Sequence, residues 1–240
     1  MATLEKHPIV TPTAWLEARK ALLEKERAFT RARDELSRAR RELPWERVEK
    51  RYVFDGRRGE LTLGELFEGR SQLVVYHFMF GPDSETPCKS CCFWADNFNG
   101  IVPHLNQRDV SFAAISRAPL NRLLALRERL GWSFEWVSSG RTDFNFDYRV
   151  SFDEEGRAAG QLVYNYAPTK TTASDLPGVS VFYRDANGAV FHTYSCYARG
   201  LDILNTAYNY LDLVPKGRDE AELPYTMAWV RIRDEYASAG

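Results

Sequence analysis

Residues 73–91 read LVVYHFMFGPDSETPCKSC and contain the two features that decide the fold. The first eight residues are almost continuously apolar, which is typical of a strand buried on both faces of a parallel sheet. After a loop that ends at Pro87, the spacing Cys88-x-x-Cys91 begins a segment in which apolar residues recur at helical intervals. The pattern predicts a buried strand, a loop, and a helix with Cys88 near its N-terminus and Cys91 one turn further along.

This placement favours thiol chemistry. The thiolate is the reactive form of cysteine, and a helix N-terminus stabilises it through unpaired backbone N–H groups and the helix dipole. We therefore predict Cys88 as the nucleophile and Cys91 as its buried partner. An inert pair and a structural zinc site are the alternatives, but zinc takes four ligands and the other candidates are Cys92, Cys196 and four scattered histidines. We expect no cofactor and no metal, and we interpret Cys92 as a packing residue.

The composition sets the class of protein. A chain of 240 residues suits one domain with an extension, and a formal net charge of −1 indicates neither a nucleic-acid partner nor an anionic membrane surface. Residues 1–12 lack the features of a signal peptide, and no apolar run is long enough to span a membrane. We expect a soluble, cytoplasmic protein. In that reducing compartment a C-x-x-C pair is more often catalytic or metal-binding than structural.

Residues 13–43 predict a long amphipathic helix, capped by Thr11 or Thr13 and stopped by Pro44. Its apolar side chains include a series at seven-residue spacing, namely Trp15, Leu22, Phe29, Leu36 and Leu43. At 1.5 Å per residue the helix would be about 46 Å long, more than the roughly 40 Å expected for the remaining domain. We interpret residues 1–45 as a helical extension and expect its overhanging part to pack against a second subunit in a homodimer. A helix laid across its own domain is the alternative.

Beyond Pro44 the sequence predicts alternating strands and helices, at residues 52–54, 61–63, 73–80, 88–105, 110–115 and 120–130. The strands at 73–80 and 110–115 with the helix between them form a β-α-β unit. Such crossovers place the C-terminal ends of parallel strands on one edge of the sheet. Arg117 should therefore lie on the same edge as the cysteines and is a site candidate, with an ordinary surface ion pair as the alternative.

The dipeptide Asn187-Gly188 separates two further apolar runs and is a strong hairpin signal. An antiparallel hairpin after a β-α-β unit is the second half of a thioredoxin fold, so we predict an α/β, three-layer, thioredoxin-like domain over residues 46–240. A final helix over residues 201–211 should stop near Pro215. Residues 131–176, with alternating aromatic side chains, predict neither strand nor loop clearly, and we interpret them as an insertion. Its part rich in Gly, Ala, Thr and Ser, residues 153–175, is the part that we expect to cover the site.

The chain also resembles a bacterial family called domain of unknown function 899, whose members are described as thioredoxin-like predicted dithiol-disulfide oxidoreductases. The matching segments cover nearly the whole chain and include residues 41–45, 76–80, 93–96, 116–119, 191–195, 199–200 and 215–220. The resemblance implies a thioredoxin-like fold and a redox-active C-x-x-C pair. In that family Cys92 and Cys196 commonly correspond to Ser or Thr, which argues against an essential role for either.

Comparison with thioredoxin itself adds supporting residues. His77 aligns with the buried strand carboxylate of thioredoxin and would relay a proton to Cys91, with a core histidine as the alternative. Pro177 matches the thioredoxin proline that faces the motif in a cis peptide bond. The family resemblance also singles out His192 and Tyr194, which strand alternation places on one face of their strand.

We predict a thiol-disulfide oxidoreductase in which Cys88 attacks a substrate disulfide and Cys91 resolves the mixed disulfide. Its partner is then a disulfide or thiol substrate. A peroxiredoxin-like thiol peroxidase is one alternative, although Glu85 stands where that family has a Thr three residues before its reactive Cys. A non-catalytic, dimeric binding protein on the same fold is the other.

Overall fold

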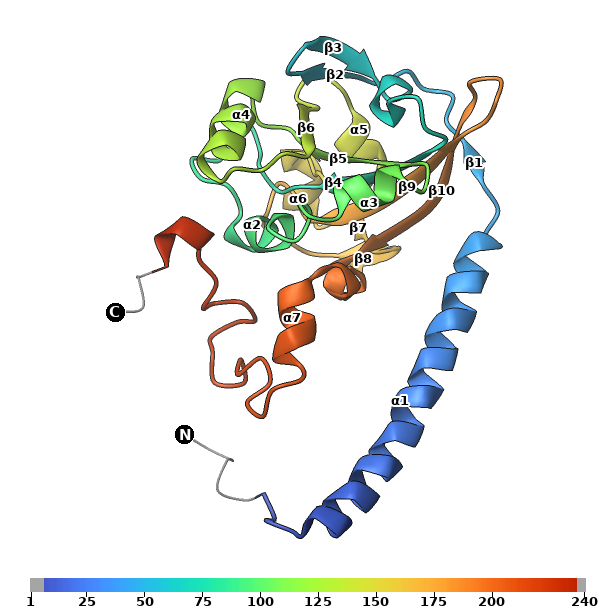
Figure 1. The fold of residues 1–240 in the computed structure, drawn as a ribbon. Helices are drawn as coiled ribbons and strands as arrows, with labels where there is room; N and C mark the ends of the chain where they lie inside the picture. The colour runs from blue at the N-terminus through green and yellow to red at the C-terminus, as the bar shows by residue number, and fades with distance from the viewer. Residues whose placement is uncertain (1–6, 237–240) are drawn as a thin grey trace.

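The computed structural model describes residues 7–236, and strand β4 lies near the centre of its main sheet (Figure 1). In that part of the chain eight strands pair in the order β1-β10-β9-β4-β5-β6-β2-β3. Their bounds are β1 Glu46–Arg47, β2 Val53–Gly56, β3 Gly59–Thr62, β4 Gln72–His77, β5 Val110–Ser116, β6 Glu135–Ser138, β9 Gly178–Arg184 and β10 Val190–Tyr197. A separate hairpin pairs β7 Leu162–Tyr164 with β8 Ala167–Thr169.

Helices complete the fold. The α-helices are α1 Pro12–Arg41, α2 Lys89–Ala95, α3 Val102–Asn106, α4 Leu120–Arg129, α5 Phe144–Asp147, α6 Glu154–Ala159 and α7 Thr206–Leu211. Short 3-10 helices are η2 Glu65–Phe67, η3 Ala198–Leu204 and η4 Arg233–Glu235. None of the helices in the described residues is both long and apolar enough to cross a membrane.

The topology is that of a thioredoxin-like fold. Strands β4 and β5 pair in parallel and are joined through α2 and α3, which confirms the predicted β-α-β unit. Strand β9 pairs antiparallel with β4, and β10 pairs antiparallel with β9 across the turn at Gly188, whose φ of 87° a glycine adopts without strain. The protein is therefore a thioredoxin-like α/β protein with a long N-terminal helix, as predicted.

The sheet separates two apolar clusters. Because successive side chains of a strand point to opposite faces, Tyr76 of β4 packs in one cluster with Phe78 and Trp136, whereas Val75 packs in the other with Phe144. Both cysteines of the C-x-x-C pair belong to the first cluster. The face on which a β4 side chain lies thus decides whether it can reach them.

Helix α1 stands apart from the sheet (Figure 1). It begins as predicted, because the Thr11 hydroxyl accepts a hydrogen bond from the Ala14 N–H at 3.3 Å, and it ends three residues before Pro44. Within the described part of the chain, none of the residues of α1 is buried, and Trp15 and Phe29 are 59% and 69% exposed. The alternative of a helix packed across its own domain is wrong.

Two predicted helices are interrupted by asparagine side chains. The helix expected over residues 88–105 is divided into α2 and α3, because the Asn97 amide donates hydrogen bonds to the carbonyls of Phe93 and Trp94 at the end of α2. The helix expected over residues 201–211 is divided at Asn205. Its side chain accepts a hydrogen bond from the Tyr208 N–H at 3.0 Å and caps α7.

Residues 131–176 are only partly the expected insertion. Glu135–Ser138 forms β6, which pairs in parallel with β5. Trp132, Phe134 and Trp136 lie in the apolar cluster that contains the two cysteines, which we call the cysteine-side cluster. The remainder contributes α5, α6 and the hairpin β7–β8. In that hairpin the Tyr164 hydroxyl donates to the Pro177 carbonyl at 2.7 Å and accepts from the Ala198 N–H at 2.9 Å.

Candidate functional site

The two cysteines lie where β4 meets α2. Cys88 is the N-cap of α2 and is half-buried, while Cys91 lies one turn into the helix and is 1% exposed. Both cysteines form hydrogen bonds with the backbone of Met79, which lies just beyond β4. The Cys88 N–H donates to the Met79 carbonyl at 3.2 Å, and the Met79 N–H donates to the Cys91 sulfur at 3.4 Å. The strand end and the helix start are therefore held together by backbone groups on either side of the loop.

The surroundings of the two thiols shift their pKa values in opposite directions. Hydrogen bonds from the Cys91 thiol and from the backbone N–H groups of Cys91 and Ser90 lower the pKa of Cys88 to about 6. Burial and the neighbouring Cys88 raise the pKa of Cys91 well above its ordinary value. At neutral pH Cys88 is thus a thiolate and Cys91 a thiol, and this is the division that a nucleophile and a resolving cysteine need.

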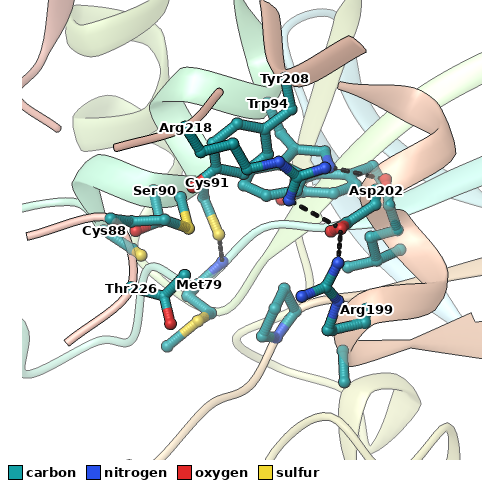
Figure 2. A pocket seen from close by; sticks show the side chains of 15 residues that line it. Met79, Cys88, Ser90, Cys91, Trp94, Arg199, Asp202, Tyr208, Arg218 and Thr226 are labelled. Carbon is teal, nitrogen blue, oxygen red and sulfur yellow. Dashed lines mark hydrogen bonds and ion pairs between the residues drawn. The ribbon is translucent and has the colours of Figure 1, made fainter. Parts of the chain in front are cut away.

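Both cysteines open onto a cavity of about 260 Å³ (Figure 2). Its lining is mainly apolar and includes Met79, Trp94, Leu201 and Met227. Tyr76 also lines it, and its hydroxyl is a hydrogen-bond partner of the Cys91 thiol. That hydrogen bond acts against the rise in the pKa of Cys91.

Part of the cavity wall comes from residues 212–232, which we call the C-terminal segment. In this segment Glu220 Oε1 accepts three hydrogen bonds, from the Tyr208 hydroxyl at 2.8 Å, the Met227 N–H at 3.0 Å and the Trp229 indole at 2.6 Å. Lys89 of α2 donates to the Ala228 carbonyl at 3.1 Å. These bonds hold the segment against α2 and α7.

Three charged side chains form a cluster at the cavity, and one of them, Arg218, comes from the C-terminal segment (Figure 2). Asp202 accepts from Arg199 at 2.9 Å and from Arg218 at 3.0 Å. Arg218 also binds Asp212 through two contacts of 2.8 Å, and its guanidinium lies 3.9 Å from the centre of the Tyr208 ring. The charges of this cluster are therefore largely paired with one another.

His77 does not reach Cys91, so the expected relay is wrong. It points to the face opposite Tyr76, stacks on Tyr148, and hydrogen-bonds to the Ser180 hydroxyl at 2.8 Å. Burial lowers the pKa of His77 to about 3, so the ring is neutral. The alternative of a core histidine describes it, and Tyr76 occupies the position beside Cys91.

His192 and Tyr194 do not share a face, contrary to the prediction. The register of β10 against β9 shifts between these two residues, so that His192 is opposite Phe182 and Tyr194 is opposite the next residue, Val181. His192 therefore packs near Phe182 on the His77 side, where it bonds to the Ser195 hydroxyl at 2.7 Å. Tyr194 packs on the cysteine-side cluster without lining the cavity.

Arg117 lies away from the cavity. Its Nε donates to Asp175 at 3.1 Å, both side chains are largely buried, and the guanidinium lies 4.8 Å from the centre of the Phe146 ring. The alternative of an ion pair describes this residue better than a role beside Cys88, although the pair is buried rather than at the surface.

Pro177 does line the cavity, as predicted, together with both cysteines. Its peptide bond is trans, as are all the others in residues 7–236, so the expected cis bond is wrong. The Pro177 carbonyl accepts a hydrogen bond from the Tyr164 hydroxyl of the β7–β8 hairpin.

Sequence reasoning missed Tyr76 and the residues after Pro215. The matching segments at 76–80, 199–200 and 215–220 contain Tyr76, Arg199, Arg218 and Glu220 and were the available signal. Nothing local connects the last three residues with the cysteines. In the described part of the chain no group of three His, Cys, Asp or Glu side chains is placed to hold a metal ion.

The sequence matches the family described as bacterial protein of unknown function, DUF899, over residues 4–236. The chain belongs to this family. No curated protein sequence matches it.

Solved structures with similar folds include peroxidoxin BcpB from Mycobacterium tuberculosis, with a TM-score of 0.46 and 14% identity over 68% of this chain and 94% of that one. Peroxiredoxin Q of Xanthomonas campestris gives a TM-score of 0.45 and 17% identity, over 65% and 87%. The mitochondrial 2-Cys peroxiredoxin from Plasmodium falciparum gives 0.41 and 15%, over 70% and 92%.

Proposed function

We propose that this DUF899 protein is a thiol-disulfide oxidoreductase that uses Cys88 and Cys91. The observation that carries the proposal is the pairing of a half-buried thiol of lowered pKa with a buried thiol of raised pKa, both facing one cavity. We place the protein in the cytoplasm, a reducing compartment in which a C-x-x-C pair is more often catalytic than structural.

In the first step the Cys88 thiolate attacks one sulfur of a substrate disulfide. The substrate S–S bond breaks, one thiolate leaves, and a mixed disulfide forms on Cys88. The Cys91 thiol then gives its proton to the departing thiolate and attacks the Cys88 sulfur, which releases the second half of the substrate as a thiolate that takes a proton from water. The substrate gains two electrons and two protons, and the cysteine pair becomes a disulfide.

Two groups assist the second step. As Cys91 becomes a thiolate, it accepts hydrogen bonds from the Met79 N–H and the Tyr76 hydroxyl. Burial raises the pKa of Tyr76, so its hydroxyl keeps the proton that it donates. These two donors therefore lower the cost of ionising a buried thiol.

The test is a redox titration of the full chain in thiol-disulfide buffers, with the Cys88–Cys91 disulfide quantified by mass spectrometry after acid trapping. We expect one reversible two-electron couple that disappears in Cys88→Ser and Cys91→Ser and persists in Cys92→Ser and Cys196→Ser. A potential near about −270 mV would indicate a reductant, and one near about −120 mV an oxidant.

Two outcomes would contradict the proposal. If no reversible disulfide forms between Cys88 and Cys91, the result favours a non-catalytic binding protein. If hydroperoxides oxidise Cys88 rapidly while disulfides do not react, the protein is a thiol peroxidase.

A further inference from the structure

The size of the cavity limits what can approach the cysteines. Small-molecule pockets usually measure roughly 300–1,000 Å³. At about 260 Å³ the cavity in front of Cys88 and Cys91 lies just below that range. It therefore suits a small molecule rather than a length of polypeptide.

The wall formed by the C-terminal segment also disfavours a folded protein as substrate. Thr226 and Met227 of this segment line the cavity together with Cys88. Packing of Phe93 on Trp229, with ring centres 5.5 Å apart, adds to the hydrogen bonds of Lys89 and Glu220 that hold the segment in place. A protein surface docking onto Cys88 would meet Thr226 and Met227 of this segment, whereas a small molecule can enter the cavity beside them.

The chemistry of the lining indicates an apolar ligand. Met79, Trp94, Leu201 and Met227 present carbon and thioether sulfur to the space beside the cysteines. Among the residues that line the cavity, the charged side chains are Arg199, Asp202 and Arg218; both arginines bind Asp202, and Arg218 also binds Asp212. A charged substrate would lose hydration on entry into the apolar part of the cavity, and the charged side chains at its edge already bind carboxylate partners.

We propose that the substrate is a small, uncharged, apolar disulfide, of which the simple dialkyl disulfides are representatives. The inference rests on the proposed function and specifies its substrate. The Cys88 thiolate attacks one sulfur of the alkyl disulfide and expels an alkanethiolate, which takes the Cys91 proton. Cys91 then expels the second alkanethiolate, which takes a proton from water. Two alkanethiols and the Cys88–Cys91 disulfide are the products.

The test measures second-order rate constants for oxidation of the reduced full chain by dimethyl, diethyl, dipropyl and dibutyl disulfide. Glutathione disulfide, cystamine and insulin serve as charged and protein disulfides. Each rate constant is divided by that of free dithiothreitol with the same disulfide, which removes intrinsic reactivity. We expect the ratio to rise with chain length, by up to about fourfold per buried methylene, until the cavity is full. The three comparison disulfides should give ratios at least about tenfold below the best dialkyl disulfide.

Two variants of the C-terminal segment test whether the cavity lining causes the dependence of the rate on alkyl chain length. Met227→Glu places a charge in the cavity and should abolish the dependence on chain length. Leu213→Glu adds the same charge at a side chain of the segment that is 81% exposed and should leave the dependence unchanged. If Met227→Glu fails to fold, Met227→Ala replaces it, since a larger cavity should move the optimum to a longer chain.

The outcomes separate this inference from the proposed function. A ratio that is flat with chain length, or highest for glutathione disulfide or insulin, overturns the apolar substrate while the redox couple stands. Equal effects of Met227→Glu and Leu213→Glu also overturn it. If no disulfide of any class forms a mixed disulfide with Cys88 in the Cys91→Ser variant, the proposed function fails and the inference fails with it.

Discussion

The backbone nitrogen of Met79 lies 3.4 Å from the sulfur of Cys91 and donates a hydrogen bond to it. Met79 follows the end of β4 by two residues, so the strand end supplies a donor to the buried thiol of the pair. The same residue accepts a hydrogen bond from the N–H of Cys88 through its carbonyl. One peptide unit on each side of Met79 thus fixes the position of both cysteines against the sheet.

Alkylation of Cys88 should follow a pKa of about 6, because the Cys91 thiol and nearby N–H groups stabilise the thiolate. In Cys91→Ala the principal donor is lost, and we expect that pKa to rise toward the ordinary thiol value. Iodoacetamide modification followed against pH by peptide mass spectrometry measures both. Cys92→Ala is the matched control, since Cys92 is not among the groups that lower the Cys88 pKa. Faster modification of Cys91 than of Cys88 would reverse the assigned roles.

Tyr76→Phe should slow the resolving step by roughly ten- to a hundredfold without changing the alkylation of Cys88. The variant removes the hydroxyl that hydrogen-bonds to Cys91, and one hydrogen bond to a charged group contributes about 1.5–3 kcal/mol. Stopped-flow measurement of mixed-disulfide decay gives the rate. Tyr52→Phe removes a tyrosine hydroxyl from the opposite cluster and should leave the rate unchanged. An unaltered rate in Tyr76→Phe would exclude the hydroxyl from the reaction.

Protonation of His77 should destabilise the folded state at acidic pH. Its pKa is about 3 in the folded protein, because of burial, and near the ordinary 6.5 when unfolded. Between these two pH values the unfolded chain binds more protons than the folded protein. The free energy of unfolding is therefore unaffected by protonation of His77 above about pH 6.5 and falls as the pH is lowered toward 3, by at most about 1.4 kcal/mol per pH unit.

The variant His77→Gln removes this titration. Urea unfolding at several pH values should show a shallower loss of stability for it than for the unsubstituted protein. Replacing the exposed His104 by Gln is the control and should leave the slope unchanged. Equal slopes in all three proteins would mean that another group accounts for the acid sensitivity.

We expect the full chain to be a homodimer through α1. The exposed side chains Trp15, Leu22 and Phe29 form an apolar stripe on a helix that its own domain leaves uncovered, and covering them contributes roughly 25 cal/mol per Å². Light scattering at micromolar concentration measures the mass. Leu22→Glu with Phe29→Glu should give a monomer.

Thr30→Glu is the control for the dimer, because residue 30 lies about 100° around the helix from Phe29 and is also exposed. A monomeric full chain would refute the dimer. A dimer that persists in the double variant would place the contact elsewhere.

Much of the fold was predictable from local patterns. The apolar run before the cysteines, the Asn187-Gly188 turn and the Thr11 cap each act through residues close in sequence, and the structure has a strand, a hairpin and a helix start at these places. Their order along the chain is that of a thioredoxin-like fold. The helix ends were less predictable, because Asn97 and Asn205 use their side chains to bond to nearby backbone groups.

The sequence by itself determined the succession of the strands β4, β5, β9 and β10 along the chain, the C-x-x-C pair and the position of Cys88 at a helix start, because periodicity, turn chemistry and capping are local. Only the tertiary structure decided which side chains accompany the cysteines. An added residue in β10 moved His192 to the other face from Tyr194, and Lys89 meets Ala228 across 139 residues of chain. Register shifts and such distant contacts depend on the packing of the whole domain, so no local pattern encodes the cavity wall beside Cys88.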